Sequence, residues 1–219
     1  MSRAETLRIV VAISGRGSNL KALLDAVATG RLAARVVGVL SDRADAAGLE
    51  IARAAGVPVA SLDRKTYASR EDFEGALDRQ LREWQCQLWV LAGFMRVLGA
   101  ELVQAWRGRL INIHPSLLPR HRGLHTHARA LEAGDAEHGA SVHLVTPELD
   151  GGPVLMQVRM PIAADDTPES LAMRLLPLEH QLLVAAVEAC ARHRIELDDT
   201  GALLVDGERL LQPLILDAA

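Results

Sequence analysis

Cysteine is scarce in this sequence, and its two copies lie far apart. Cys86 and Cys190 form no C-x-x-C pair. The sequence therefore indicates neither a disulfide framework nor a cysteine-based zinc site. Neither cysteine stands in a motif that suggests a covalent enzyme intermediate.

Long apolar runs and an excess of positive charge are also missing. There is no stretch of ~20 apolar residues and no signal-peptide region after the short polar N-terminus, Met1 to Thr6. We therefore expect a cytoplasmic protein without a membrane partner. The chain carries 24 Lys and Arg against 28 Asp and Glu, a net charge of −4. It offers no general basic surface for nucleic acid, although single basic residues can still bind a small anion.

What the chain does contain is enough apolar material for a core. Hydrophobic residues make up 49% of its 219 residues and charged residues 24%. That is sufficient for one large domain or two small ones without disulfide or metal staples. We see no repeat, low-complexity segment or linker, and expect a single domain over residues 1–219.

The first half of the chain alternates apolar strand patterns with amphipathic helix patterns. We predict strands at 7–13, 36–40, 57–62, 88–91 and 110–113, and helices at 19–28, 45–55, 70–85 and 101–106. Ser18 is expected to cap the first helix, and Gly56 to end the second in a left-handed conformation. This alternation predicts an α/β fold with a mostly parallel sheet covered by helices on both faces.

The pattern changes after His114. Residues 115–127 show no periodicity, which in a compact domain indicates a functional loop. Segments 140–145 and 153–161 read as antiparallel strands around a turn at 149–152. Thr167 is expected to cap a long helix from Pro168 to about Arg192, and residues 205–208 to form a final hairpin.

A glycine loop joins the first strand to the first helix. In the run SGRGSN at 14–19, two glycines allow close approach of a ligand, and the exposed helix N–H groups favour a phosphate. The third glycine of a dinucleotide fingerprint is absent because Leu20 occupies its position, and no Walker A lysine follows. A simple glycine turn is an equally good interpretation of this spacing.

Asn112 and His114 end a predicted central strand. Alternation puts both on one side of its carboxyl end, where open parallel sheets bind ligands. An amide donor beside a group that titrates near neutrality can stabilise an oxyanion during acyl transfer. A polar pair at a strand end more often has a structural role than a functional one. The proline-rich loop that follows makes the functional interpretation more favourable than the pair alone would.

Asp150 lies in a tight turn, LDGGP at 149–153. Turn geometry alone explains an Asp-Gly pair, but an acid that reaches His114 would orient its imidazole and relay a proton. Six of the eight histidines fall between His114 and His143. The His125-x-His127 pair has no carboxylate or cysteine at ligand spacing, so we predict no metal site.

Several of these motifs together resemble one family. The matching runs are ISG and SN in 13–19, VLAGFMR at 90–96, INIHPSLLP at 111–119, GLHTH at 123–127 and LDGGP at 149–153. In this order, over nearly the whole chain, they resemble the glycinamide ribonucleotide transformylases, folate-dependent formyltransferases of purine synthesis. The family fold is a doubly wound, mostly parallel sheet, with antiparallel strands toward the C-terminal part.

The resemblance implies roles for particular residues. Asn112, His114 and Asp150 are expected to form the catalytic group. The acceptor's phosphoribosyl end is expected at Gly17, Ser18, Asn19 and Glu179, and the folate at Arg70, Met95, Arg96, Val97, Leu98, Asn112, Thr146 and Asp150. Residues 1–110 then form a phosphate-binding half, and 111–219 a folate and catalytic half. Arg16 and Arg122 replace residues that are smaller or different in many relatives, and neither belongs to the catalytic group.

The implied reaction is direct formyl transfer from the cosubstrate 10-formyltetrahydrofolate to the amine of glycinamide ribonucleotide, without a metal. Asn112 and protonated His114 would stabilise the tetrahedral oxyanion, and Asp150 would hold His114 charged and help remove the amine proton. The resemblance leaves open a monomer or a homodimer.

Two other functions remain open at this point. Formyltetrahydrofolate hydrolase and methionyl-tRNA formyltransferase share such a catalytic group, but usually carry an extra domain for which we expect no room here. A non-catalytic nucleotide-binding module would use the same glycine loop, with Asp42 at the end of the second strand binding a ribose. The missing third glycine argues against the second alternative.

Overall fold

The computed structural model describes residues 6–217, so the polar N-terminal segment Met1 to Thr6 lies almost entirely outside the described residues. The strands are β1 (Leu7–Ile13), β2 (Ala34–Ser41), β3 (Val59–Ser61), β4 (Leu88–Leu91), β5 (Leu110–His114), β6 (Glu137–Leu144), β7 (Val154–Pro161), β8 (Ile195–Leu197), β9 (Leu203–Val205), β10 (Glu208–Arg209) and β11 (Leu214–Leu216). The helices are α1 (Ser18–Ala28), α2 (Gly48–Ala54), α3 (Arg70–Glu83), α4 (Ala100–Ala105), α5 (Thr126–Glu132) and α6 (Pro168–Arg192), with a 3₁₀ turn at Arg64–Thr66.

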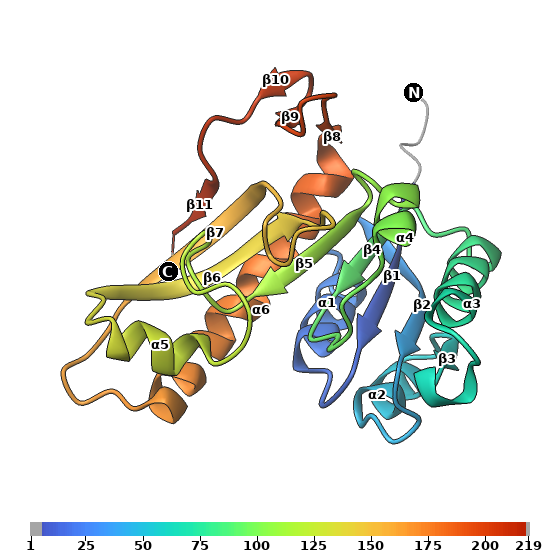
Figure 1. Cartoon of the computed structure of the whole chain (residues 1–219), viewed down its shortest axis with the longest axis horizontal. Coiled ribbons are helices and arrows are strands. Elements are labelled where there is room, and N and C mark those ends of the chain that lie inside the picture. The colour runs from blue at the N-terminus through green and yellow to red at the C-terminus, as the bar shows by residue number, and fades with distance from the viewer. Residues whose placement is uncertain (1–5, 218–219) are drawn as a thin grey trace.

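The main sheet is mostly parallel and doubly wound (Figure 1). Its spatial order is β11-β7-β6-β5-β4-β1-β2-β3. β1 to β5 pair in parallel, and β6 pairs antiparallel with both β5 and β7. The chain winds outward from β1 to β3 and then returns to β4 and β5 on the other side. The carboxyl ends of β1 and β4 therefore flank the reversal point, where open α/β sheets bind ligands. The predicted fold class is confirmed.

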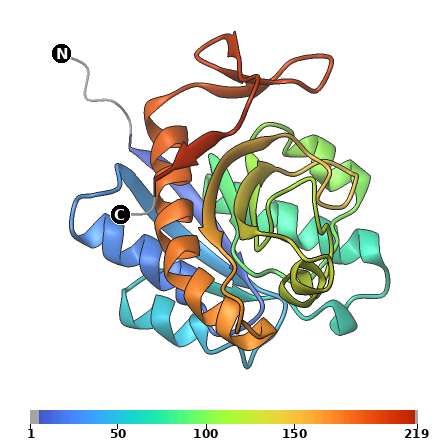
Figure 2. The same ribbon diagram turned by 90° about the vertical axis from the view of Figure 1, so that its left-hand side faces the viewer.

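The core consists of two apolar layers, one on each face of the sheet. The buried residues of β1 alternate between them: Ile9, Val11 and Ile13 pack on the side of α1, α2 and α6, and Val10 and Ala12 on the side of α3 and α4. Figure 2 shows α6 running along the molecule beside the sheet. Because both faces of β1 are covered, the strand is apolar throughout, as a central parallel strand should be.

Some predicted boundaries were wrong. Ser18 does not cap α1, because Gly17 takes the N-cap position in a left-handed conformation (φ 76°) and no side-chain cap hydrogen bond forms. α2 begins three residues later than predicted, since Asp45 pairs with Arg43 outside the helix. The short helix α5 was not predicted. The hairpin of β9 and β10 is confirmed but is not final, because β11 follows it and pairs with β7.

Helix α6 matches its prediction at both ends. Thr167 caps it, with its side chain accepting from the backbone N–H of Ser170 while the Ser170 hydroxyl accepts from Thr167 N–H. This capping box satisfies two N–H groups that the helix itself leaves unpaired. It fixes the start of the helix that carries Glu179.

Candidate active site

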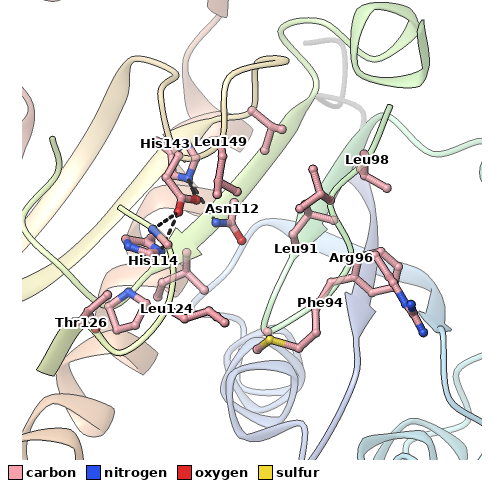
Figure 3. A pocket seen from close by; sticks show the side chains of 18 of the residues that line it. Leu91, Phe94, Arg96, Leu98, Asn112, His114, Leu124, Thr126, His143 and Leu149 are labelled. Atoms are coloured by element: carbon pink, nitrogen blue, oxygen red, sulfur yellow. Dashed lines mark hydrogen bonds and ion pairs between the residues drawn. The ribbon is translucent and has the colours of Figure 1, made fainter. Parts of the chain in front are cut away.

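A cavity of about 720 Å³ opens at the carboxyl ends of β4 and β5. Its walls come from the loop after β4, the end of β5, the loop before α5 and the turn between β6 and β7. Figure 3 shows the polar side chains of Asn112, His114 and His143 on one side, and the apolar Leu91 and Leu98 on the other. A mostly apolar cavity of this size with a few convergent polar groups is typical of a small-molecule site.

The three predicted catalytic side chains meet in this cavity. His114 Nδ1 lies 3.5 Å from Asp150 Oδ2, and Asn112 extends from the same strand end as His114. Asp150 adopts a left-handed conformation (φ 47°) in its turn and accepts a hydrogen bond of 2.9 Å from Gly123 N–H. The distance between His114 Nδ1 and Asp150 Oδ2 is longer than that of a good hydrogen bond.

Both ring nitrogens of His114 face hydrogen-bond acceptors. Nε2 lies 3.1 Å from the backbone oxygen of His121, and Nδ1 faces the Asp150 carboxylate. The side chain is 8% exposed. A neutral ring would turn a lone pair toward one of these oxygens, whereas the protonated ring donates to both. The ring of His114 therefore lies between two oxygen acceptors, one facing each nitrogen.

His143 is a member of this cluster that the sequence prediction missed. It lies opposite Asn112 in the antiparallel pairing of β5 and β6, with its Nε2 3.1 Å from Asn112 Nδ2 and 3.7 Å from Asp150 Oδ1. The side chain is 2% exposed, and burial lowers its pKa to about 4. The ring is neutral at pH 7.

A second cavity, of about 390 Å³, adjoins the first at the start of α1. The predicted acceptor residues Gly17, Ser18, Asn19 and Glu179 all line it. Gly17 is required here twice over, by its positive φ and because a Cβ would lie 2.6 Å from the Cα of Gly48. Since no side chain caps α1, its first N–H groups remain available to a ligand.

Two polar side chains at the border of the cavities are held close together. Asn19 Nδ2 lies 3.4 Å from Glu179 Oε2, and burial raises the pKa of Glu179. Asn19 Oδ1 is buried and has no hydrogen-bond partner within residues 6–217. An unpaired buried acceptor costs free energy unless a ligand donates to it. Asn19 and Glu179 line both cavities, which therefore share this border.

Hydrogen bonds to the buried Asp42 carboxylate and the Ser14 hydroxyl hold the loop after β4, at Met95 and Arg96, in place. Ser14 Oγ donates to Asp42 Oδ1 (2.5 Å) and accepts from Met95 N–H (2.8 Å). Arg96 Nε donates to Asp42 Oδ2 (2.6 Å). Both carboxylate oxygens of Asp42 are thus occupied and its side chain is 3% exposed. This geometry argues against Asp42 as a ribose ligand, and so against the nucleotide-binding module.

The predicted folate residues divide into two groups. All but one of them line the larger cavity: Met95, Arg96, Val97, Leu98, Asn112, Thr146 and Asp150. Arg70 does not line it, but donates to the backbone oxygen of Val97 (2.7 Å) and pairs with Glu74, which accepts from Gly99 N–H. Arg70 therefore stabilises the 95–98 loop, which forms part of the cavity wall, without lining the cavity itself.

Comparison with known proteins identifies the relationship that this geometry suggests. The family model described as Formyl transferase matches residues 7–187. This chain belongs to the formyl transferase family. Within it, the chain is 45% identical over 204 residues to phosphoribosylglycinamide formyltransferase of Escherichia coli strain K12, covering 93% of this chain and 96% of that protein.

Solved structures agree. The phosphoribosylglycinamide formyltransferase of Coxiella burnetii superposes with a TM-score of 0.92 at 43% identity, covering 97% of this formyl transferase and all of the other chain. A formyltetrahydrofolate deformylase from Pseudomonas putida superposes with a TM-score of 0.82 at 27% identity, covering 94% of this chain and 72% of that one. The predicted class, a folate-dependent formyltransferase enzyme of purine biosynthesis, is confirmed.

Neither a metal site nor a reactive cysteine is found among the residues that the structure describes. Within residues 6–217 there is no group of three or more His, Cys, Asp or Glu side chains placed to hold a metal ion. Burial raises the pKa of Cys86 and of Cys190 to about 12, so neither is a ready thiolate. No helix in the described part of the chain has the length and apolarity to cross a membrane.

Two buried histidines should make this formyl transferase sensitive to acid. Burial lowers the pKa of His138, as of His143, to about 4, against 6.5 for an ordinary histidine. Between those values the unfolded chain binds more protons than the native protein, so stability falls as the pH drops. Glu179 has a raised pKa, so this single group makes the native protein more stable as the pH falls, opposite to the two histidines. We expect Tm to fall steadily from about pH 6.5 to 4.

The measurement is a series of thermal melts across that pH range. His138 Nε2 lies 3.0 Å from His127 Nδ1. His138→Gln removes one of the histidines whose pKa burial lowers, so its Tm should depend less on pH than that of the wild type. Equal slopes for the two proteins would contradict this assignment.

Proposed function

We propose that this chain transfers the formyl group of 10-formyltetrahydrofolate to the primary amine of glycinamide ribonucleotide. The observation that carries the proposal is the shared border of two cavities. One offers a helix N-terminus for a phosphate, the other a mostly apolar cleft with Asn112, His114 and Asp150. The amine of one substrate and the formyl carbon of the other can meet between them.

The acceptor occupies the smaller cavity in this proposal. Its phosphate accepts hydrogen bonds from the free N–H groups at Gly17, Ser18 and Asn19, where the helix dipole also favours an anion. The half-buried Glu179 is placed to accept from the ribose hydroxyls, and Asn19 Oδ1 offers a further acceptor. The amine then points toward the larger cavity.

The folate occupies the larger cavity. Its flat ring system suits the apolar walls, and four side chains around the mouth are apolar yet exposed: Met95 (68%), Val97 (64%), Leu124 (71%) and Leu149 (54%). Exposed apolar side chains gathered around a cleft are typical of a ligand site. Backbone groups of residues 95–98 and Thr146 supply the polar contacts.

The catalytic group acts on the carbonyl of the formyl group. The amine lone pair attacks the formyl carbon, and the carbonyl π pair moves onto oxygen. Asn112 donates to that oxygen, and protonated His114, held by Asp150, stabilises its charge. Collapse restores the carbonyl and breaks the bond to N10, which keeps the electron pair and gains a proton while the amine loses one through Asp150. No covalent enzyme intermediate forms.

The proposal also covers the location, oligomeric state and partners of the enzyme. The enzyme acts in the cytoplasm on two small molecules, as a monomer or homodimer, with neither nucleic acid nor membrane as partner. Residues 1–110 supply most of the phosphate site and 111–219 the catalytic side chains, while Glu179 and the 95–98 loop each cross that division.

Mass spectrometry of the reaction products tests the proposal. Incubation of the protein with both substrates should convert glycinamide ribonucleotide to its N-formyl derivative and release tetrahydrofolate. Formate and unchanged ribonucleotide as the products would contradict it.

Asp42 provides a separate prediction about the folate loop. Asp42→Asn removes the ion pair with Arg96. It also weakens the hydrogen bond that holds Ser14, whose hydroxyl accepts from the backbone N–H of Met95. A hydrogen bond to a charged group contributes about 1.5–3 kcal/mol, so we expect KM for the folate to rise by roughly tenfold or more, with a smaller change in kcat.

Steady-state kinetics with saturating acceptor would measure this effect. Asp45→Asn is the matched control, because it removes an equivalent pair with Arg43 on the exposed surface. Equal folate KM values for the two variants would show that the Asp42 network does not set the loop.

A further inference from the structure

We propose that His143 is a positioning residue that orients the Asn112 carboxamide toward the formyl oxygen. The inference rests on the proposed function, because it assigns Asn112 as an oxyanion donor. The two residues are direct partners in the β5–β6 pairing, so their side chains leave the sheet on the same face. Asn112 Nδ2 lies 3.1 Å from His143 Nε2 (Figure 3).

The protonation of His143 is determined by its other nitrogen. Nδ1 lies 3.0 Å from the backbone oxygen of Leu144, which can only accept, so Nδ1 carries the hydrogen. Gly152 leaves room for that oxygen, because a Cβ at position 152 would lie 1.8 Å from it. In the neutral ring Nε2 therefore presents a lone pair.

A lone pair at Nε2 accepts only one orientation of the Asn112 carboxamide. The NH₂ group can donate to it, whereas the flipped amide would bring Oδ1 against the lone pair. One amide hydrogen is thus committed to His143, and the second hydrogen on Nδ2 stays free for the cavity. A freely rotating or flipped carboxamide would instead present an oxygen to the developing negative charge.

Burial, against the pull of the nearest charge, keeps His143 in the neutral form. The side chains with charge facing His143 are His114, Arg122 and Asp150, and the Asp150 oxygen stands 3.7 Å away, beyond hydrogen-bond range. Burial outweighs the attraction of Asp150, so the pKa of His143 lies well below neutrality. His143 is then an acceptor throughout the neutral pH range.

A double-mutant cycle on kcat tests the proposal. His143→Leu removes the acceptor, and we expect kcat to fall by about 10- to 100-fold, less than the 10²–10³ typical of losing an oxyanion donor outright. KM for both substrates should change little, because the oxyanion exists only in the transition state. In an Asn112→Ala background the same substitution should have no further effect on kcat, and His143→Gln, which keeps an acceptor, should recover part of the loss.

His138→Leu is the control for burial, since His138 lies on the same strand, is 1% exposed and does not contact Asn112. Any effect of His138→Leu on kcat should be independent of Asn112, so the losses of the two single variants should add in the double variant. A wild-type kcat in folded His143→Leu, or a loss additive with Asn112→Ala, would overturn the positioning role. If Asn112→Ala itself kept wild-type kcat, the assignment of the oxyanion donor under the proposed function would fail instead.

A measurement on the unaltered protein avoids dependence on mutant folding. Long-range ¹H–¹⁵N NMR distinguishes the two neutral tautomers of histidine. The proposal requires His143 to carry its hydrogen on Nδ1 at pH 7. A hydrogen on Nε2 would leave no lone pair for Asn112 and would overturn the proposal.

Discussion

Replacing Asp150 with asparagine is expected to lower kcat by about 10²-fold or more, the scale of losing an acid–base group. The carboxylate that faces His114 Nδ1 would become a neutral amide, so the imidazolium would lose its partner and the amine its proton acceptor. The backbone should tolerate the change, because asparagine readily adopts the left-handed conformation seen at Asp150 (φ 47°).

Asp206→Asn is the matched control for this experiment. Asp206 also adopts a left-handed conformation (φ 54°) and is also followed by a glycine, but it lies in the exposed hairpin between β9 and β10. We expect its kcat to equal that of the wild type. A folded Asp150→Asn protein with the same kcat as this control would remove Asp150 from the mechanism.

The dephosphorylated acceptor, glycinamide riboside, is expected to have a much higher KM than the ribonucleotide. A phosphate dianion accepts several hydrogen bonds at the start of α1, and each charge-assisted bond contributes about 1.5–3 kcal/mol. Loss of one or two of them should weaken binding by at least roughly tenfold. Some of this binding energy positions the amine, so kcat is expected to fall as well.

Initial rates with the two acceptors give the comparison. Inorganic phosphate supplies the control, because it should compete with the ribonucleotide and leave the KM of the riboside unchanged. Gly17→Val is a less specific probe of the phosphate site, since its Cβ would also press on the backbone of Gly48. Equal use of both acceptors would reduce the loop to a glycine turn.

Local pattern was enough to predict the elements that carry the site. The apolar run of β1 and the alternation in β5 do not depend on distant residues, and they put Asn112 and His114 at the correct end of the correct strand. The turn at Asp150 follows from its two glycines. These features are encoded within a few consecutive residues, so they can be read without the fold.

The parts that were missed depend on pairing between distant segments. His143 reaches Asn112 only through the antiparallel register of β5 and β6, which no local pattern specifies. The sequence leaves Asp42 free to bind a ribose, but in the fold its two carboxylate oxygens are bonded to Ser14 and Arg96. The cap of α1 was assigned to Ser18 because serine caps are common, while the left-handed Gly17 starts the helix one residue earlier.

The fold alone does not distinguish formyl transfer to an amine from transfer to water, since a formyltetrahydrofolate deformylase shares it. The most direct test follows the loss of 10-formyltetrahydrofolate by absorbance, with and without glycinamide ribonucleotide. We predict rapid loss that depends on the ribonucleotide, with one formylated product formed for each folate consumed. Loss at the same rate without the ribonucleotide, with formate as the product, would contradict the proposed transfer and identify the enzyme as a hydrolase.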